Sequence, residues 1–246
     1  MNTSTTNQQG SQGVRIIPTY EALAHDIKNL GVDTVFGLMS DDTAMLAVEI
    51  DTIGITFHGA RHENNAIAMA DGYATATGRL GIAIIGRGPA AANGLHAAVF
   101  ASRTGSKVLI IYGEAPVGGG AVNTIGPDYK AFNSRAVFAG AGLQSFFPTS
   151  PPAARAALAD AVGVAMRGNV ATLHLPTDVQ LSEIEVRNDD QGIIPLAPLA
   201  PMPARAQSID TVAGLLANSQ RPLIVAGMGA HRADAGPVLE KLADKI

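Results

Sequence analysis

Residues 55–85 read ITFHGARHENNAIAMADGYATATGRLGIAII, and this stretch decides the class of fold. It begins with a short strand-like run at 55–58 and ends with a continuous apolar run at 81–85. Between them lies an alanine-rich segment, residues 63–77, which Gly78 closes as a glycine commonly closes a helix. The stretch therefore predicts a strand, a helix and a second strand that is fully buried.

The same alternation of strand-like and helix-like segments continues along the chain. The strand-like segments are continuous apolar runs, which is typical of a parallel sheet covered on both faces. We therefore expect an α/β fold, a doubly wound and mostly parallel sheet with helices on both faces. Further helices are predicted at 19–30, 43–51, 90–103, 128–138 and 151–167, and further strands at 34–38, 107–112, 144–147 and 170–175.

Composition excludes several classes of function. The 246 residues are 47% hydrophobic and 15% charged, which suits a globular domain. The absence of cysteine excludes disulfides, thiolate zinc sites and cysteine nucleophiles. A net charge of -4 offers no basic footprint for nucleic acid, and no apolar run approaches the roughly 20 residues of a membrane helix. We expect a cytoplasmic protein with neither a nucleic-acid nor a membrane partner.

The chain divides into four predicted segments. Residues 1–13 are a polar tail without periodicity, which we expect to be disordered. Residues 14–185 form the main domain, and the proline-rich stretch 186–206 is a linker. Residues 207–246 contain a predicted helix at 208–218, a strand at 222–226 and a helix from 234. Because about 40 residues cannot easily form a core, we expect a partial second α/β domain, the truncated start of a longer one.

The functional site is expected at the carboxyl ends of the strands, because ligands bind there in open parallel sheets. Residues 37–42, 59–63, 86–89 and 113–116 follow predicted strands. Glu63 lies at one of these positions, where a helix begins, and unpaired backbone N–H groups favour an ionised carboxylate. On spacing alone, an ordinary acid of a first helical turn is the simpler interpretation.

The residues around Glu63 favour a more specific interpretation. RHE at 61–63, MADGYA at 69–74 and ATG at 76–78 resemble the pyrimidine-binding domain of thiamine-diphosphate-dependent enzymes, especially the acetohydroxyacid synthase and 2-oxo acid decarboxylase branch. Further segments resemble that family in the same order. These are VFG at 35–37, GP at 88–89, LPTDVQ at 175–180, and RP at 221–222 with IVAG at 224–227, the last of which resembles the start of the family's central domain.

The resemblance implies specific roles for the residues at these positions. Glu63 would hydrogen-bond the ring nitrogen of the cofactor's aminopyrimidine and so promote removal of the thiazolium proton. Lys130 takes the place of a glutamine of the synthase branch, which would change the second-substrate chemistry. The implied cofactor-binding residues are Gly37, Leu38, Glu63, Gly88, Pro89 and Asn93, and the implied substrate region contains Met39, Ser40, Arg87 and Lys130.

The resemblance also implies a reaction and partners. We expect the N-terminal portion of a thiamine-diphosphate-dependent lyase or transferase, acetolactate synthase-like, acting on a 2-oxo acid by decarboxylation, carboligation or C–C cleavage. The family binds the diphosphate and Mg²⁺ through a C-terminal domain marked by Gly-Asp-Gly and a later Asn, a pattern that this sequence lacks. We therefore expect no metal site in this chain and no activity from it alone. Its partner would be a second copy, in a homodimer or tetramer, or a chain that supplies the diphosphate-binding domain.

Two alternatives remain open at this stage. The chain is either part of an enzyme or a non-catalytic binding or regulatory module that kept the fold and pairs with another chain. Ala66, Ala70 and Ala74, at helical spacing, admit either a helix of a second subunit or close packing within their own subunit.

Overall fold

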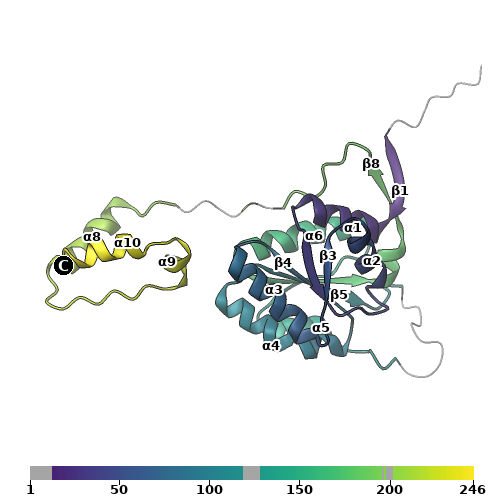
Figure 1. The fold of residues 1–246 in the computed structure, drawn as a ribbon, viewed down its shortest axis with the longest axis horizontal. Coiled ribbons are helices and arrows are strands. Elements are labelled where there is room, and N and C mark those ends of the chain that lie inside the picture. Colours follow the sequence, from purple (N-terminus) through teal and green to yellow (C-terminus); the bar gives the residue numbers. More distant parts are fainter. Residues whose placement is uncertain (1–12, 119–127, 196, 198–201) are drawn as a thin grey trace, which may run out of the picture. The chain divides into compact units, whose positions relative to one another are not determined.

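The computed structural model describes residues 13–118, 128–195, 197 and 202–246 (Figure 1). The chain separates into two units, Met1–Pro198 and Leu199–Ile246, which are described in turn. The predicted polar tail lies outside the described residues except for Gly13, as do residues 119–127 of the glycine-rich loop.

The first unit is built on a six-stranded sheet in which every neighbouring pair of strands is parallel. The register places Ile84 beside Ile111, and Ile111 beside Leu173, so the carboxyl ends of the central strands lie at one edge. This confirms the predicted parallel sheet. Its order is β3 (Thr56–Gly59), β2 (Thr34–Gly37), β4 (Gly81–Ile85), β5 (Val108–Glu114), β7 (Val170–Pro176) and β6 (Gln144–Phe146).

Helices cover both faces of the sheet, as predicted (Figure 1). The side chains of β4 alternate between the two faces. Ile82 and Ile84 pack in one apolar cluster, and Ala83 and Ile85 in the other. The first cluster includes α1 (Thr19–Asn29), α2 (Ala44–Thr52) and α6 (Pro151–Met166), and the second includes α3 (Glu63–Thr77), α4 (Pro89–Thr104) and α5 (Ser134–Gly140).

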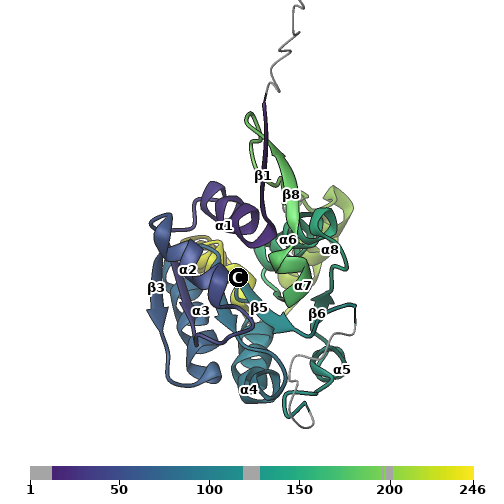
Figure 2. The same ribbon diagram turned by 90° about the vertical axis from the view of Figure 1, so that its right-hand side faces the viewer.

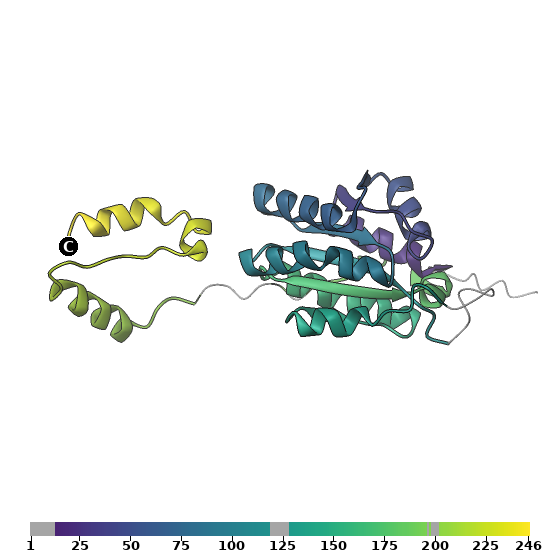
Figure 3. The same ribbon diagram turned by 90° about the horizontal axis from the view of Figure 1, so that it is seen from below.

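Helix α3 packs tightly against both β4 and α4, and α3 and α4 lie side by side (Figure 3). Ala66, Ala70 and Ala74 are buried in the second apolar cluster. A Cβ atom on Gly81 would lie 2.1 Å from the carbonyl oxygen of Ala70, so the helix backbone touches the strand. The three alanines therefore serve packing within their own subunit, which settles one open alternative.

A separate two-stranded antiparallel ribbon joins the two ends of the first unit (Figure 2). It pairs β1 (Val14–Pro18) with β8 (Glu183–Arg187), which follows the short helix α7 (Thr177–Leu181). We predicted neither strand, because each takes its partner from the far end of the domain. Strand β8 extends into the stretch 186–206 that was expected to be a linker.

The structure corrects two predicted elements. The helix expected at 128–138 begins only at Ser134, since the Asn133 side chain accepts a hydrogen bond from the Ala136 N–H at 3.1 Å and caps the helix. In the second unit, residues 222–226 form no strand, and Leu223 is 86% exposed. A strand needs a neighbouring strand for its backbone hydrogen bonds, and these residues have none. The described helices there are α8 (Ala206–Ala217), α9 (Met228–Arg232) and α10 (Gly236–Ala243).

Across the described part of the chain, no helix is long and apolar enough to cross a membrane.

Candidate active site

A pocket of about 270 Å³ opens where the turns after β2 and β4 meet the starts of α3 and α4. Eight of the ten residues predicted for the site line this pocket, together with Gly86, Ala90 and Tyr129. Gly37 and Gly88 do not line it. The eight are Leu38, Met39, Ser40, Glu63, Arg87, Pro89, Asn93 and Lys130.

The two glycines shape the backbone around the pocket. Gly88 has a φ of 69°, which favours glycine, and a Cβ there would lie 2.2 Å from the carbonyl oxygen of Lys130. A Cβ on Gly37 would lie 2.5 Å from the carbonyl oxygen of Ile84. Gly88 therefore lets the chain segment that carries Lys130 approach the start of α4, and Gly37 lets β2 approach β4.

Glu63 is the first residue of α3 and is half-buried at the pocket wall. His62 caps the helix, because its Nδ1 accepts a hydrogen bond from the Asn64 N–H at 3.1 Å. Asn93 of α4 donates from Nδ2 to Oε2 of Glu63 at 3.0 Å. Among the residues that the structure describes, Oε1 of Glu63 has no hydrogen-bond donor, so this oxygen is available to a ligand.

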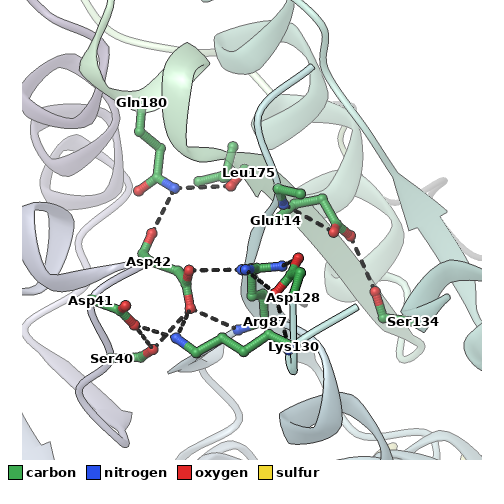
Figure 4. Close-up of polar contacts among 11 residues, drawn as sticks. Ser40, Asp41, Asp42, Arg87, Glu114, Asp128, Lys130, Ser134, Leu175 and Gln180 are labelled. Carbon is green, nitrogen blue, oxygen red and sulfur yellow. Dashed lines mark hydrogen bonds and ion pairs between the residues drawn. The ribbon is translucent and has the colours of Figure 1, made fainter. Parts of the chain in front are cut away.

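A network of charged side chains adjoins the pocket, and two of its members, Arg87 and Lys130, line it (Figure 4). Arg87 donates from Nε to Oδ1 of Asp42 at 3.0 Å, and its two terminal nitrogens donate to Asp128 at 2.9 and 2.8 Å. Lys130 Nζ donates to Oδ2 of Asp42 at 2.9 Å and also to Asp41. The side chains of Arg87 and Asp42 are only 2% exposed.

These contacts shift the pKa values of Asp41, Arg87, Asp128 and Lys130 in the directions that favour their charged forms. The hydrogen bonds from Arg87 lower the pKa of Asp128, and those bonds raise the pKa of Arg87 against the opposing effect of burial. The hydrogen bond from Lys130 lowers the pKa of Asp41. Burial acts to lower the pKa of Lys130, but its bonds to the two aspartates raise it overall. The pocket therefore presents charged groups at neutral pH.

Sequence reasoning did not identify Asp42 or Asp128 as site residues. One pattern in the sequence could have indicated these ion pairs. Two carboxylates, Asp41 and Asp42, follow one strand, and a cation, Arg87, follows the neighbouring strand. Gln180 holds this arrangement in place, since its Nε2 donates to the carbonyl oxygens of Asp42 and Leu175, both at 2.9 Å. The segment 175–180 thus ties the end of β7 to the pocket.

A second polar cluster lies outside the pocket lining, around His174 of β7. Its Nδ1 lies 3.6 Å from Oε2 of Glu114, to which Ser134 donates at 3.1 Å. Burial lowers the pKa of His174. Burial acts to raise the pKa of Glu114, but its contacts with His174, the Ala115 N–H and Ser134 lower that pKa overall. Tyr112 stacks on the His174 ring. Burial, with a smaller contribution from the charge of Glu63, raises the pKa of Tyr112 well above its usual value.

The described residues contain no group of three or more histidine or acidic side chains placed to hold a metal ion. The prediction that Mg²⁺ and the cofactor's diphosphate bind to another domain remains a prediction.

Comparison with known proteins identifies related sequences. Residues 18–132 match the family model described as thiamine pyrophosphate enzyme, N-terminal TPP binding domain. All ten predicted site residues lie within this range. The chain is 29% identical to a probable acetolactate synthase of Mycobacterium bovis over 252 residues, which cover 100% of the chain and 43% of that protein.

Two other relatives carry different names. The chain is 27% identical to a sulfoacetaldehyde acetyltransferase of Rhodobacter capsulatus, over 93% of the chain and 37% of the relative. It is 28% identical to a glyoxylate carboligase of Escherichia coli, over 91% of the chain and 37% of the relative. The chain therefore spans about two-fifths of the length of the curated relatives that it matches.

Proposed function

The chain belongs to the thiamine pyrophosphate enzyme family and carries its N-terminal domain. We propose that the chain is part of an enzyme that acts on a 2-oxo acid, and that Glu63 helps to activate thiamine diphosphate in that enzyme. The observation that carries this proposal is the hydrogen bond from Asn93 to Glu63 in the wall of the pocket. It fixes one carboxylate oxygen and leaves the other without a hydrogen-bond donor among the described residues.

The residues of the pocket fit the aminopyrimidine end of this cofactor. A planar ring with polar nitrogens needs a hydrogen-bonding group at its edge and apolar contacts on its faces. Oε1 of Glu63 supplies an acceptor, and Leu38 and Pro89 supply apolar surface in the same pocket. When bound, thiamine diphosphate supplies the carbanion-stabilising chemistry that protein side chains lack.

The residues of the chain then orient the cofactor and hold a proton. Glu63 would hold a proton at the ring nitrogen of the aminopyrimidine, which is general acid–base work by a positioned carboxylate. Asn93 sets the rotamer of that carboxylate.

We further propose that the substrate carboxylate binds at the Lys130 end of the pocket. Lys130 and Glu63 line the same cavity, so a cation for the substrate and a carboxylate for the cofactor share one site. The names of the relatives, a synthase, an acetyltransferase and a carboligase, are consistent with carboligation or a related C–C cleavage. The diphosphate and Mg²⁺ would be bound by another domain, in a homo-oligomer or by a partner chain, in the cytoplasm.

Replacing Glu63 with Gln in the full-length protein tests the proposal. The amide keeps the size of the side chain but cannot accept a proton, so turnover of pyruvate should fall by about 10²- to 10⁴-fold. Glu185→Gln, at an exposed position on β8, is the matched control and should keep normal turnover. Near-normal turnover by Glu63→Gln would refute the proposed role.

A further inference from the structure

The two carboxylate partners of Lys130 differ sharply in exposure. The side chain of Asp42 is 2% exposed, whereas that of Asp41 is 71% exposed. Lys130 itself is 16% exposed and lines the pocket. Its ammonium group is therefore anchored on one side by a buried carboxylate and on the other by a carboxylate in water.

The two ion pairs also differ in how easily they separate. Asp42 accepts further hydrogen bonds from Arg87 Nε at 3.0 Å and from Ser40 Oγ at 3.0 Å. Loss of a buried partner leaves an uncompensated buried charge and shifts an equilibrium by more than about a hundredfold. The Asp41 carboxylate is 71% exposed, so water can solvate it when it leaves Lys130, and a pair with such an exposed partner shifts an equilibrium by about fivefold. A competing anion would therefore displace Asp41 and leave Asp42 in place.

We infer that Asp41 occupies the position of the substrate carboxylate on Lys130 and leaves it when a 2-oxo acid binds. This inference rests on the proposed function and identifies a residue that sets substrate affinity. Asp41 follows Ser40 in the turn after β2, and Ser40 Oγ lies 3.0 Å from Oδ1 of Asp41. Because that side chain is mostly in water, it can turn outward without opening the buried part of the network.

The balance of charge predicts which acids bind. The network contains two cations, Arg87 and Lys130, and three carboxylates, Asp41, Asp42 and Asp128. Exchange of the Asp41 carboxylate for that of a monocarboxylic 2-oxo acid leaves the charge around Lys130 unchanged. A dicarboxylic 2-oxo acid would bring one negative charge without a partner. The site should therefore prefer pyruvate to 2-oxoglutarate.

The experiment measures the affinity of the 246-residue chain for pyruvate, from the relaxation of the pyruvate methyl protons. This signal does not depend on turnover. Asp41→Asn removes the competing charge and should lower the Kd by about two- to fivefold. Lys130→Gln should abolish binding, and Lys130→Arg should retain it. Asp51→Asn, at an exposed position at the end of α2, is the matched control and should leave the Kd unchanged.

Three results would overturn the inference. They are an unchanged or higher Kd for Asp41→Asn, the absence of pyruvate binding to the unaltered chain, and tighter binding of 2-oxoglutarate than of pyruvate. A loss of turnover in Glu63→Gln combined with an unchanged Kd in Asp41→Asn would refute only the exchange at Lys130. Normal turnover in Glu63→Gln would instead refute the proposed function.

Discussion

Asn93 donates a hydrogen bond from Nδ2 to Oε2 of Glu63 over 3.0 Å, and this bond joins the first turn of α3 to the second turn of α4 at the pocket wall. The contact sets the direction of the only glutamate that lines the described pocket. The effect of this hydrogen bond on turnover can be tested separately from the effect of Glu63, because Asn93 can be replaced while Glu63 is kept.

Asn93→Ala should leave Glu63 in place but free to rotate. We expect turnover of the full-length protein to fall by about tenfold, the effect of losing roughly 1.4 kcal/mol of positioning. Thermal stability should change little, because Asn93 is exposed. Steady-state kinetics of Asn93→Ala and of Asn65→Ala, an exposed asparagine on α3, check this expectation. Equal turnover in the two variants would contradict it.

The pair of Arg87 and Asp42 should be important for stability, since both side chains are 2% exposed. Arg87→Met leaves the Asp42 carboxylate buried with one cation fewer. The free energy of unfolding should fall by about 3 kcal/mol or more, as is typical when a buried ion pair loses one partner. Urea unfolding measures this loss. Arg187→Met, which breaks a pair whose side chains are 76% and 71% exposed, should leave the urea midpoint nearly unchanged.

Two glycines near α3 should respond oppositely to the same substitution. Gly81→Ala places a Cβ 2.1 Å from the backbone oxygen of Ala70, so α3 and β4 must move apart at a cost of about 1–3 kcal/mol. Gly72, within α3, has no atom within 4 Å of such a Cβ. Gly72→Ala should therefore stabilise the protein by about 0.5–1 kcal/mol through helix propensity. Thermal unfolding of both variants gives the two signs, and a shift in the same direction would contradict the packing.

His174 should make stability depend on pH. Burial lowers its pKa below the usual value of 6.5, so the unfolded chain binds a proton at a higher pH than the folded chain. Stability is then complete above pH 6.5 and falls as the pH drops below it, by at most about 1.4 kcal/mol per pH unit.

Urea unfolding between pH 7.5 and 5 checks the role of His174. His174→Gln should flatten the slope in this range, and His96→Gln, an exposed control on α4, should retain it. Glu114 acts in a lower range, because its pKa lies below the usual 4.5 and its contribution is lost only as the pH falls through that lower value. An unchanged slope in His174→Gln would rule out this histidine as the cause.

The isolated 246-residue chain should bind thiamine diphosphate weakly even with Mg²⁺, if another domain holds the diphosphate as we propose. Calorimetry with thiamine diphosphate and Mg²⁺ measures the affinity, and thiamine without its diphosphate is the matched ligand. We expect similar, weak binding of the two ligands. Submicromolar binding that requires the diphosphate would contradict the proposal that another domain holds it.

Most of the fold was accessible from local patterns in the sequence. The helix predicted at 63–77 and the strand predicted at 81–85 have the same bounds in the structure. The strand is predictable because burial on both faces of a sheet requires a continuous apolar run. The end of the helix is predictable because a glycine commonly ends a helix. The positions of Glu63, Gly88 and Pro89 after the strands followed from the same alternation.

Tertiary structure alone decided which charges meet. Arg87 lies 45 positions from Asp42 and 41 from Asp128, and Lys130 lies 88 positions from Asp42. Sequence periodicity reports which side of an element is buried, but such partners depend on strand order, register and the close approach that Gly88 permits. For the same reason the pairing of β1 with β8 was not predicted. The sequence by itself determined the parallel sheet and the place of Glu63, and long-range packing determined the neighbours of Lys130.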